Sequence, residues 1–583
     1  MSERGRAEQR PQRARVPRRA RVDQEHQVSD EISNAFDLVP EIGNGYRWYD
    51  WPWRSLWWLL SGWRRKAIPR KLRLRINTAA NWLHPFSDHQ RNKVWSRDSW
   101  QHNVFVPPDE HVNVAGVWVV ELFPPTDLPA LEKGLSQNGW VKNRLSMPGD
   151  SGNRQTLARA RSSGGPRWWR LADIMTWDSR WYVPDGFRSK LPPEFSLIEL
   201  RAIQVGAGLT AVVAEFTLTD GAATDLDVEW HKESEPALIR AKPRWRPLDR
   251  QFAKYMRVQT KRKDLHTAAR RWLGQNLPGF FTSNSEEQPL FDLLLFDQYD
   301  PTALFVPKSR DDAIKFSDAF RALGLDAREY YQATSPDLPK LVLSSVDGSL
   351  HEWLRGGATW TLWGRRDAVV DALGKDGLSG YGTDRNRAIA SRLVDNMYNL
   401  FVMLAVSEWL RVVGEDYATL RDRASTMHGR FRPSAVRHLR RSLLTLSLNL
   451  STVRADVRDF WARPWRWDGD ATFTYRVTSR YQQRSGAGRR SDPRPLDFNA
   501  NLRKQQEAEF KRLIEADREY RDILSTAASL GASADSYKLG RIALWVAIVS
   551  LAVALVTVLL SQFSGNSVLG LFGKALQQWV GAT

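Results

Sequence analysis

Residues 542–560 read IALWVAIVSLAVALVTVLL, and only Ser550 and Thr557 among these 19 residues have polar side chains. The stretch contains no charged residue, and as a helix with a rise of 1.5 Å per residue it is about 28 Å long. That length matches the roughly 30 Å hydrocarbon core of a lipid bilayer. Because a buried helix of a soluble protein is rarely apolar on every face over such a length, the sequence predicts a transmembrane helix at 542–563.

Basic residues flank this segment unequally. Lys538 and Arg541 precede it, whereas Lys574 is the one basic residue after it. Because Lys and Arg concentrate in the cytoplasmic flanks of membrane spans, we expect a single-pass integral membrane protein whose large N-terminal part is cytoplasmic. Residues 564–583 repeat apolar residues at helical spacing and include Trp579, which predicts a short amphipathic tail at the membrane interface.

Small residues recur in steps of three and four through the apolar segment. They are Ala543, Ala547, Ser550, Ala554, Thr557 and Ser561. Within lipid, helices associate through close backbone approach at small side chains rather than through the hydrophobic effect. The stripe therefore predicts a helix–helix contact, most simply with another copy of the chain in a homo-oligomer. Packing on residues 564–583 or on a different protein also fits, and several copies around one axis would line a narrow polar path.

Long antiparallel helices are expected before the span. Residues 386–462 predict a helical hairpin region whose second helix carries apolar residues in alternating steps of three and four. These residues are Val436, Leu439, Leu443, Leu446, Leu450, Val453 and Val457. Such a heptad seam keeps one edge against a partner helix, as in a coiled coil. After an insertion rich in Arg, Gly and Pro at 463–499, a stalk helix at 500–541 is expected to continue into the transmembrane helix.

Residues 101–385 predict an α/β region, read either as a first domain at 101–280 and a second module at 281–385, or as one larger domain with insertions. Strands are predicted at 112–123, 196–205, 209–219, 290–297, 303–306, 340–346 and 358–363, and helices at 127–138, 250–273 and 311–323. The expected fold class is therefore α+β/α: cytoplasmic α/β modules, then long antiparallel helices, then a stalk helix that continues into the C-terminal transmembrane helix.

Composition points to anionic partners. The 583 residues include 85 Lys and Arg against 66 Asp and Glu, a net charge of +19, which favours anionic lipid, acidic proteins or nucleic acid as partners. Residues 1–40 predict a disordered basic tail without the apolar segment of a signal peptide. Residues 41–100 form a Trp-rich basic segment that either lies at a membrane surface or packs on the first domain. The absence of cysteine excludes disulfides, thiolate metal sites and cysteine catalysis.

Short motifs predict no enzyme, metal site or cofactor. The sequence Gly-Ala-Gly at 206–208 precedes a strand rather than a helix, which favours a hairpin turn over a dinucleotide site. His84, Asp88 and His89 do not have the spacing of a known metal site, and we expect an ordinary surface cluster there. His-Lys-Glu at 231–233 lacks the paired cysteines that a zinc deaminase needs.

From about residue 288 to 583, this order of elements resembles the CorA-like divalent-cation channels. In both, an α/β domain precedes long antiparallel helices and a stalk helix that enters the membrane near the C-terminus. At the place of that family's Gly-Met-Asn motif this chain reads Ser564-Gly565-Asn566-Ser567, and the second span of the family is missing or degenerate. The resemblance concerns architecture alone, and it implies an oligomer whose spans surround an ion path.

Two functions follow as hypotheses. The first is a membrane-anchored, self-associating protein whose cytoplasmic region senses or binds a ligand, and whose stalk couples that region to the membrane. A degenerate CorA-like ion channel is one form of it. The second is a tail-anchored, non-conducting scaffold that recruits acidic partners, anionic lipid or nucleic acid.

Overall fold

The structure is a computed structural model that describes most of the chain, with gaps. The described residues are 50–94, 106, 109–141, 152–162, 167–177, 186–232, 237–241, 244–248, 250–302, 317–325, 331–346, 358–374, 378, 385–426, 433–462, 471–477, 496–561 and 568–581. The chain divides into two compact units. The first unit comprises residues 1–412 and 452–509, and the second comprises residues 413–451 and 510–583.

Strands from distant parts of the first unit form one mixed sheet in the order β13-β12-β9-β10-β11-β8-β1-β5-β4-β2-β3. They are β1 (Val112–Phe123), β2 (Trp168–Met175), β3 (Phe187–Arg188), β4 (Phe195–Gln204), β5 (Thr210–Leu218), β8 (Leu290–Phe296), β9 (Tyr331–Ser335), β10 (Leu338–Ser345), β11 (Thr359–Arg365), β12 (Thr474–Val477) and β13 (Leu496–Asp497). The pairs β8–β11 and β2–β3 are parallel, and the other neighbours are antiparallel.

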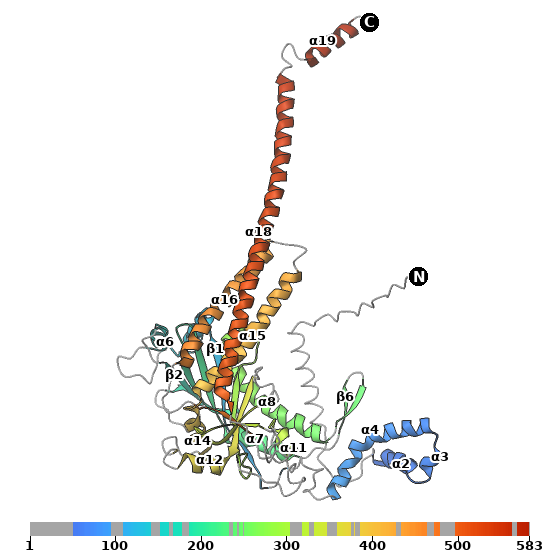
Figure 1. The fold of residues 1–583 in the computed structure, drawn as a ribbon, viewed down its shortest axis with the longest axis vertical. Helices are drawn as coiled ribbons and strands as arrows, with labels where there is room; N and C mark the ends of the chain where they lie inside the picture. The colour runs from blue at the N-terminus through green and yellow to red at the C-terminus, as the bar shows by residue number, and fades with distance from the viewer. Residues whose placement is uncertain are drawn as a thin grey trace. The chain divides into compact units, whose positions relative to one another are not determined.

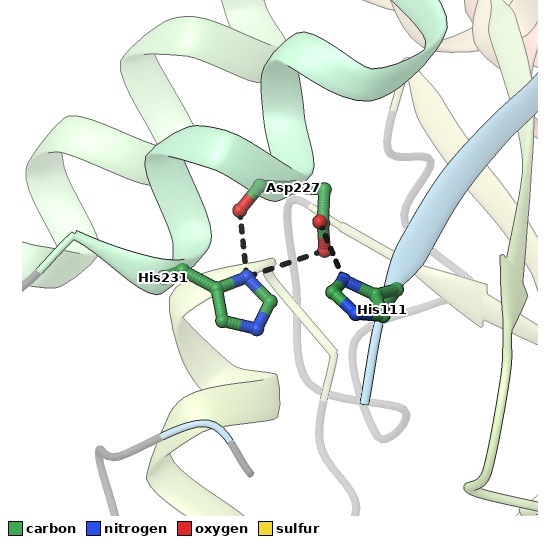
Figure 2. Close-up of side chains that lie close together, drawn as sticks. All are labelled: His111, Asp227 and His231. Carbon is green, nitrogen blue, oxygen red and sulfur yellow. Dashed lines mark hydrogen bonds and ion pairs between the residues drawn. The ribbon is translucent and has the colours of Figure 1, made fainter. Parts of the chain in front are cut away.

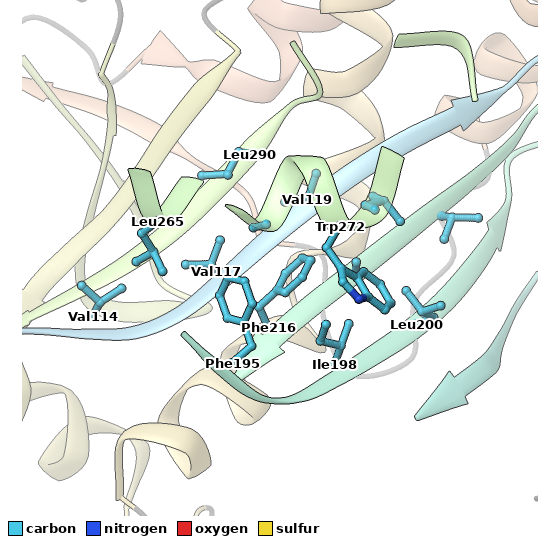
Figure 3. Close-up of a cluster of buried hydrophobic side chains, with 14 of the residues drawn as sticks. Val114, Val117, Val119, Phe195, Ile198, Leu200, Phe216, Leu265, Trp272 and Leu290 are labelled. Carbon is cyan, nitrogen blue, oxygen red and sulfur yellow. The ribbon is translucent and has the colours of Figure 1, made fainter. Parts of the chain in front are cut away.

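β1 lies between β5 and β8, and all but one of its residues are buried. An uninterrupted apolar run of this kind is typical of a strand covered on both faces. Val117 and Val119 belong to the apolar cluster under α8 (Arg250–Asn276), as Figure 3 shows. Trp118 alternates with them, and its ring centroid lies 5.9 Å from that of Phe401. The sheet therefore carries a packed layer of helix on each side of β1.

Gly116 allows α14 (Arg385–Val394) to approach β1 closely. A Cβ at this position would lie 3.2 Å from the Cβ of Ala390 and 3.0 Å from the ring of Trp118. The register of β1 against β8 shifts at the same point. A glycine within a strand often marks such a bulge and a close neighbour.

Further helices of the first unit surround the sheet. They are η2 (Pro125–Asp127), α5 (Leu128–Gln137), α6 (Asn153–Arg161), α7 (Asp220–His231), α9 (Phe280–Ser283), α11 (Ser317–Ala322) and α12 (Arg366–Leu373). α7 packs on both β1 and α8, and α11 packs on α8. Gly324 follows α11 with a φ of +81°, which is a backbone conformation that glycine adopts without strain and that commonly ends a helix.

The Trp-rich segment forms three helices, α2 (Asp50–Leu60), α3 (Arg64–Ala67) and α4 (Arg70–Val94). α2 and α4 pack on each other, and Trp53 and Leu83 are buried in their small apolar core. α4 also contacts β7 (Arg244–Leu248), which forms a two-stranded sheet with β6 (Ala237–Ala241).

Several sequence predictions can be compared with the first unit. β1 has the predicted bounds, and the β4–β5 hairpin matches within one residue at each end. The strands expected of two modules belong to one sheet, because β8 pairs with β1 on one side and with β11 on the other. The strand predicted at 303–306 lies outside the described residues.

Two predictions in the first unit need correction. The helix predicted at 250–273 is three residues too short: α8 continues through Gly274 to Asn276, since helical glycine is only mildly unfavourable. The range 463–499 is predicted only as an insertion, yet it contributes β12 and β13, the last two strands at one end of the sheet, next to the buried Phe473. Alternating Thr-Tyr-Arg-Val residues suit a strand once β9 offers an unpaired edge.

Three helices continue from the first unit into the second: α15 (Tyr398–Thr426), α16 (Pro433–Ala462) and α18 (Phe498–Ser561). Asp517 of α18 is buried in the second unit and accepts hydrogen bonds from Tyr417 of α15, at 3.0 Å, and from Ser447 of α16. Arg521 lies 2.7 Å from its other carboxylate oxygen. One buried carboxylate therefore joins all three helices, which favours a single packing arrangement.

The predicted helices differ from the structure in one place. The first helix of the region 386–462 is interrupted at 395–397, where α14 and α15 meet with a bend of 71°. α18 has no such break: it runs for 64 residues from Phe498 to Ser561, and α19 (Val568–Val580) follows it (Figure 1). Of the heptad residues, Leu439, Leu443, Leu450, Val453 and Val457 are buried and Leu446 is half-buried, while the side chain of Val436 lies outside the description.

Candidate functional site

The segment Leu539–Val558 of α18 is long and apolar enough to cross a membrane, with a mean hydropathy of 2.3. No residue in the most apolar part of this segment is buried by the rest of the described chain. Its large exposed side chains are Leu539, Ile542, Leu544, Trp545, Val546, Ile548, Val549, Leu551, Val553, Leu555, Val556 and Val558. Apolar surface in water costs about 25 cal/mol per Å², so a contiguous surface of this kind marks an interaction with lipid or protein.

A second apolar stretch is long enough to cross a membrane only if two helices that meet at a bend are counted as one span. This pair is Asn386–Val394 with Tyr398–Arg423. Its apolar residues are accounted for, because Leu393, Leu400 and Leu404 are buried. The two stretches therefore differ in burial: the bent pair supplies core residues of the folded protein, whereas Leu539–Val558 is apolar and exposed.

The predicted contact stripe lies on this exposed segment. Its exposed members are Ala543, Ala547, Ser550, Ala554 and Thr557, and the side chain of Ser561 lies outside the description. The hydroxyl of Thr557 donates to the carbonyl of Val553 at 2.7 Å, so its polarity is satisfied within the helix. Of the flanking residues, Arg541 is exposed and Trp579 is 77% exposed, while the side chain of Lys538 is not described.

α2 and α3 present a second apolar surface, mixed with positive charge. We call it the Trp–Arg surface, and it comprises Trp51, Trp57, Trp58, Trp63, Arg64 and Arg65, of which the four tryptophans are 50% to 79% exposed. The guanidinium of Arg64 lies 3.7 Å from the ring centroid of Trp58, a cation–π contact. The sequence left open whether this segment packs on protein or faces a membrane. Trp53 is buried in the small core of α2 and α4, whereas these four tryptophans are exposed.

A cluster of charges is buried where α14 and α15 cover β4 and β5. Burial and the nearby Glu199 raise the pKa of Glu215 to about 7, against the opposing effect of Arg201. Arg201 donates to the hydroxyl of Tyr398 and lies 3.5 Å from Asp395. Because Arg201 pairs with Asp395 and its charge opposes that of Glu215, we interpret the cluster as a structural contact between sheet and helices that titrates near neutral pH.

Asp292 of β8 is the acceptor of a second buried network. Arg262 donates to both of its carboxylate oxygens, at 2.6 and 2.7 Å, and Nε2 of His266 lies 2.9 Å away. Burial raises the pKa of Asp292, but the charge of Arg262 and the bond to His266 outweigh it and hold the pKa below its usual range. Every member is buried, and the network joins α8 to the sheet.

A third cluster is open to solvent, at the junction of β1 and α7. Figure 2 shows His111, Asp227 and His231 pointing toward one another. Nδ1 of His111 lies 2.9 Å from Oδ2 of Asp227, and Nδ1 of His231 lies 3.4 Å from Oδ1 and 2.9 Å from the main-chain oxygen of the same residue. The His111 side chain is 50% exposed, that of His231 28% and that of Asp227 16%.

The carboxylate of this cluster is held in its ionised form. Burial raises the pKa of Asp227, but hydrogen bonds from His231, the Val112 N–H and His111 outweigh burial and lower it. The N–H of Val112 donates to Oδ1 at 2.9 Å. One anion and two imidazoles thus share a single solvent-facing position, which is a donor set that divalent transition metals accept.

The sequence motifs do not predict this cluster. His231 stands in His-Lys-Glu, which lacks the cysteines of a zinc deaminase and predicts no site by itself. The spacing of Asp227 and His231, four residues apart on one helix face, was the signal available. His111 is 116 residues from Asp227, and only the packing of α7 on β1 brings the two residues near each other. The side chains of His84, Asp88 and His89 lie outside the described residues, and the turn at 206–208 joins β4 to β5 as predicted.

α8 and the segment before β8 border a cavity of about 400 Å³. Lys263, Arg270 and Arg271 line it from the helix, and Glu286 and Glu287 line it from the segment. Arg270 lies 3.0 Å from Glu287. Cations and carboxylates both line the cavity, and Glu286 pairs with Arg411.

Comparison with family models, with curated proteins and with solved structures finds no match for this chain.

Proposed function

We propose that this chain is a membrane-anchored, self-associating protein whose α/β unit is held at the cytoplasmic face. The observation that carries the proposal is the exposed segment Leu539–Val558, which is apolar on every side in a chain whose other long apolar stretch is buried. A bilayer satisfies this surface without any further partner. The exposed apolar side chains of α19, such as Leu571 and Phe572, fit the interfacial region beyond the span.

Labelling with a membrane-impermeant maleimide tests the anchor and its direction. Because the chain has no cysteine, Thr526→Cys and Gly581→Cys each introduce one reactive thiol on either side of the span. In intact cells we expect labelling at position 581 alone, and labelling at 526 only after the membrane is permeabilised. Equal labelling of both positions in intact cells, or release of the protein by alkaline carbonate, overturns the proposal.

Self-association rests on the stripe of Ala547, Ser550, Ala554 and Thr557 along the exposed segment. In lipid, a face of small residues allows two helix backbones to approach closely. If several copies surround an axis, the hydroxyls of Ser550 and Thr557 face it, which is the arrangement that a degenerate CorA-like ion path requires. Ligand binding to the α/β unit would then act by favouring one packing of the helices that continue into the membrane.

The Trp–Arg surface favours a second candidate, a tail-anchored scaffold without a pore. Exposed tryptophans beside arginine suit the headgroup region of an anionic membrane or an acidic protein. This surface needs no ion path and no coupling to the span.

Ion flux from the purified protein in liposomes separates the two candidates. Flux that Ser550→Leu or Thr557→Leu abolishes supports the pore, because a bulky apolar group closes a hydroxyl-lined path. Absence of flux from an oligomeric protein, together with salt-sensitive capture of anionic lipid, supports the scaffold.

A further inference from the structure

We propose that His111, Asp227 and His231 form a binding site for a divalent transition-metal cation of the zinc class. Their candidate ligand atoms all lie within 4.8 Å of one another. Two imidazole nitrogens and one carboxylate oxygen are donors that zinc takes at about 2.0–2.2 Å. An ion bound by these three atoms would take a water molecule as the fourth ligand of a tetrahedral site.

The elements that carry the three residues are fixed before any metal arrives. Thr219 caps the start of α7 by accepting from the N–H of Ala222, and the helix is tied down by Trp230, which is fully buried and donates to the carbonyl of Ala319 at 2.8 Å. His111 immediately precedes β1, in which all but one residue are buried. A site on rigid elements loses little entropy on binding.

The cations near α7 pair with carboxylates other than that of Asp227. Of its neighbours on the helix, Asp225 lies 2.8 Å from Lys261, and Glu229 lies 2.7 Å from Arg257. Within the described residues, the ion-pair contacts of Asp227 are with His111 and His231 alone. Neutral imidazoles do not neutralise the charge of the Asp227 carboxylate and can themselves bind metal, so the three groups together attract a cation.

The same contacts have a simpler reading, in which the histidines only hydrogen-bond Asp227 and so fasten α7 to β1. Both readings predict some loss of stability when the residues are replaced. They differ in whether the protein binds a metal ion, and in whether that binding depends on all three residues.

Zinc titration of the full-length protein in detergent, without an affinity tag, tests the site by calorimetry. We expect one site with a dissociation constant in the micromolar range or tighter. His111→Ala and Asp227→Asn should each weaken it at least tenfold. Asn keeps an acceptor for the Val112 N–H but loses the charge, and His111 is half exposed, so both variants keep the fold. His438→Ala is the control, because His438 is an exposed histidine on α16 far along the chain.

Two further readouts decide the matter. Cobalt(II) bound to the wild-type protein should give the intense visible absorption of a low-coordinate site, and Asp227→Asn should lose it. Zinc should also raise the melting temperature of the wild type but not of His111→Ala, since binding to the folded state alone stabilises it. No zinc binding by the wild type, or equal binding by wild type and both variants, overturns the proposal.

Discussion

Glu215 and Asp173 are carboxyl groups that the fold keeps away from water. Burial raises the pKa of Asp173 to about 6, with Arg170 opposing, and raises that of Glu215 to about 7, with Glu199 adding to the effect. An acid whose pKa is raised on folding favours the folded state while it is protonated. Its contribution is therefore complete below the unfolded pKa near 4.5 and is lost as the pH rises through about 7.

Replacing Glu215 by Gln removes this pH dependence in part. Between pH 4.5 and about 7 the free energy of unfolding of the wild type should fall, and Glu215→Gln should fall less. Above pH 7 the variant is expected to be more stable by about 1–3 kcal/mol, since one pKa unit corresponds to about 1.4 kcal/mol. Denaturant titration at a series of pH values measures both slopes.

Asp173 is unchanged in Glu215→Gln, so the free energy of unfolding of this variant should still fall in part as the pH rises. The outcome that contradicts the argument is a parallel pH profile for the two proteins, or a variant that is less stable at every pH. Arg201, Arg387 and Asp395 also face Glu215, so the double variant with Asp173→Asn extends the test to the whole cluster.

At the scale of elements, Asp456 of α16 joins a helix to the β4–β5 turn. Its Oδ2 accepts from the N–H groups of Gly208 and Leu209, at 2.7 and 2.6 Å. A Cβ on Gly206 would lie 2.3 Å from this carboxyl group, so the turn is built from glycine partly to admit it. The turn was predictable from Gly-Ala-Gly, but its partner 248 residues away was not.

Asp456→Ala should lower the free energy of unfolding by about 1–3 kcal/mol, because two buried N–H groups lose their acceptor. Asp459→Ala is the matched control: Asp459 lies on the same helix, but its side chain is 72% exposed and pairs with Arg458. Thermal or urea denaturation of both variants provides the measurement. Equal stability of the two would mean that the turn finds other acceptors.

The sequence predicts individual elements better than it predicts what they contact. The strand at 112–123 and the long final helix follow from runs of one residue type, which are local signals. The order of the sheet depends on pairings across hundreds of residues, so β8 could not be placed between β1 and β11 in advance. The break at 395–397 also involves a residue distant in the sequence, since the backbone N–H of Ala471 donates to the carbonyl of Asn396. The histidine–aspartate cluster was missed for this reason too.

The apolar segment of α18 gives a prediction about helix association. Ala547→Phe or Ala554→Phe places a bulky ring in the small-residue stripe and should weaken self-association by on the order of tenfold or more, about 1.4 kcal/mol. Val556→Phe adds similar bulk on the opposite face and serves as the control. Crosslinking and light scattering in detergent measure the oligomer. An unchanged oligomer in the stripe variants, or equal loss in Val556→Phe, argues against this contact face.

For the whole molecule, the two apolar surfaces predict two kinds of membrane attachment with different physics. The segment Leu539–Val558 is held by the hydrophobic effect, which salt does not weaken. The Trp–Arg surface depends in part on charge, and screening shortens the reach of charges from about 10 Å at 0.1 M salt to about 3 Å at 1 M. Removing the first attachment should therefore expose the second.

A chain ending at residue 538 should no longer resist alkaline extraction from membranes, yet should still sediment with vesicles that contain anionic lipid at low salt. Raising the salt to about 1 M should release it, and Trp57→Ala with Trp58→Ala should weaken binding several-fold, because these exposed rings insert at the interface. Trp177→Ala is the control, since Trp177 is 76% exposed but lies outside the Trp–Arg surface. If the shortened chain ignores lipid charge, or if Trp177→Ala has the same effect, the Trp–Arg surface is not a membrane contact. The scaffold then needs a protein partner, while the anchor stands on its own evidence.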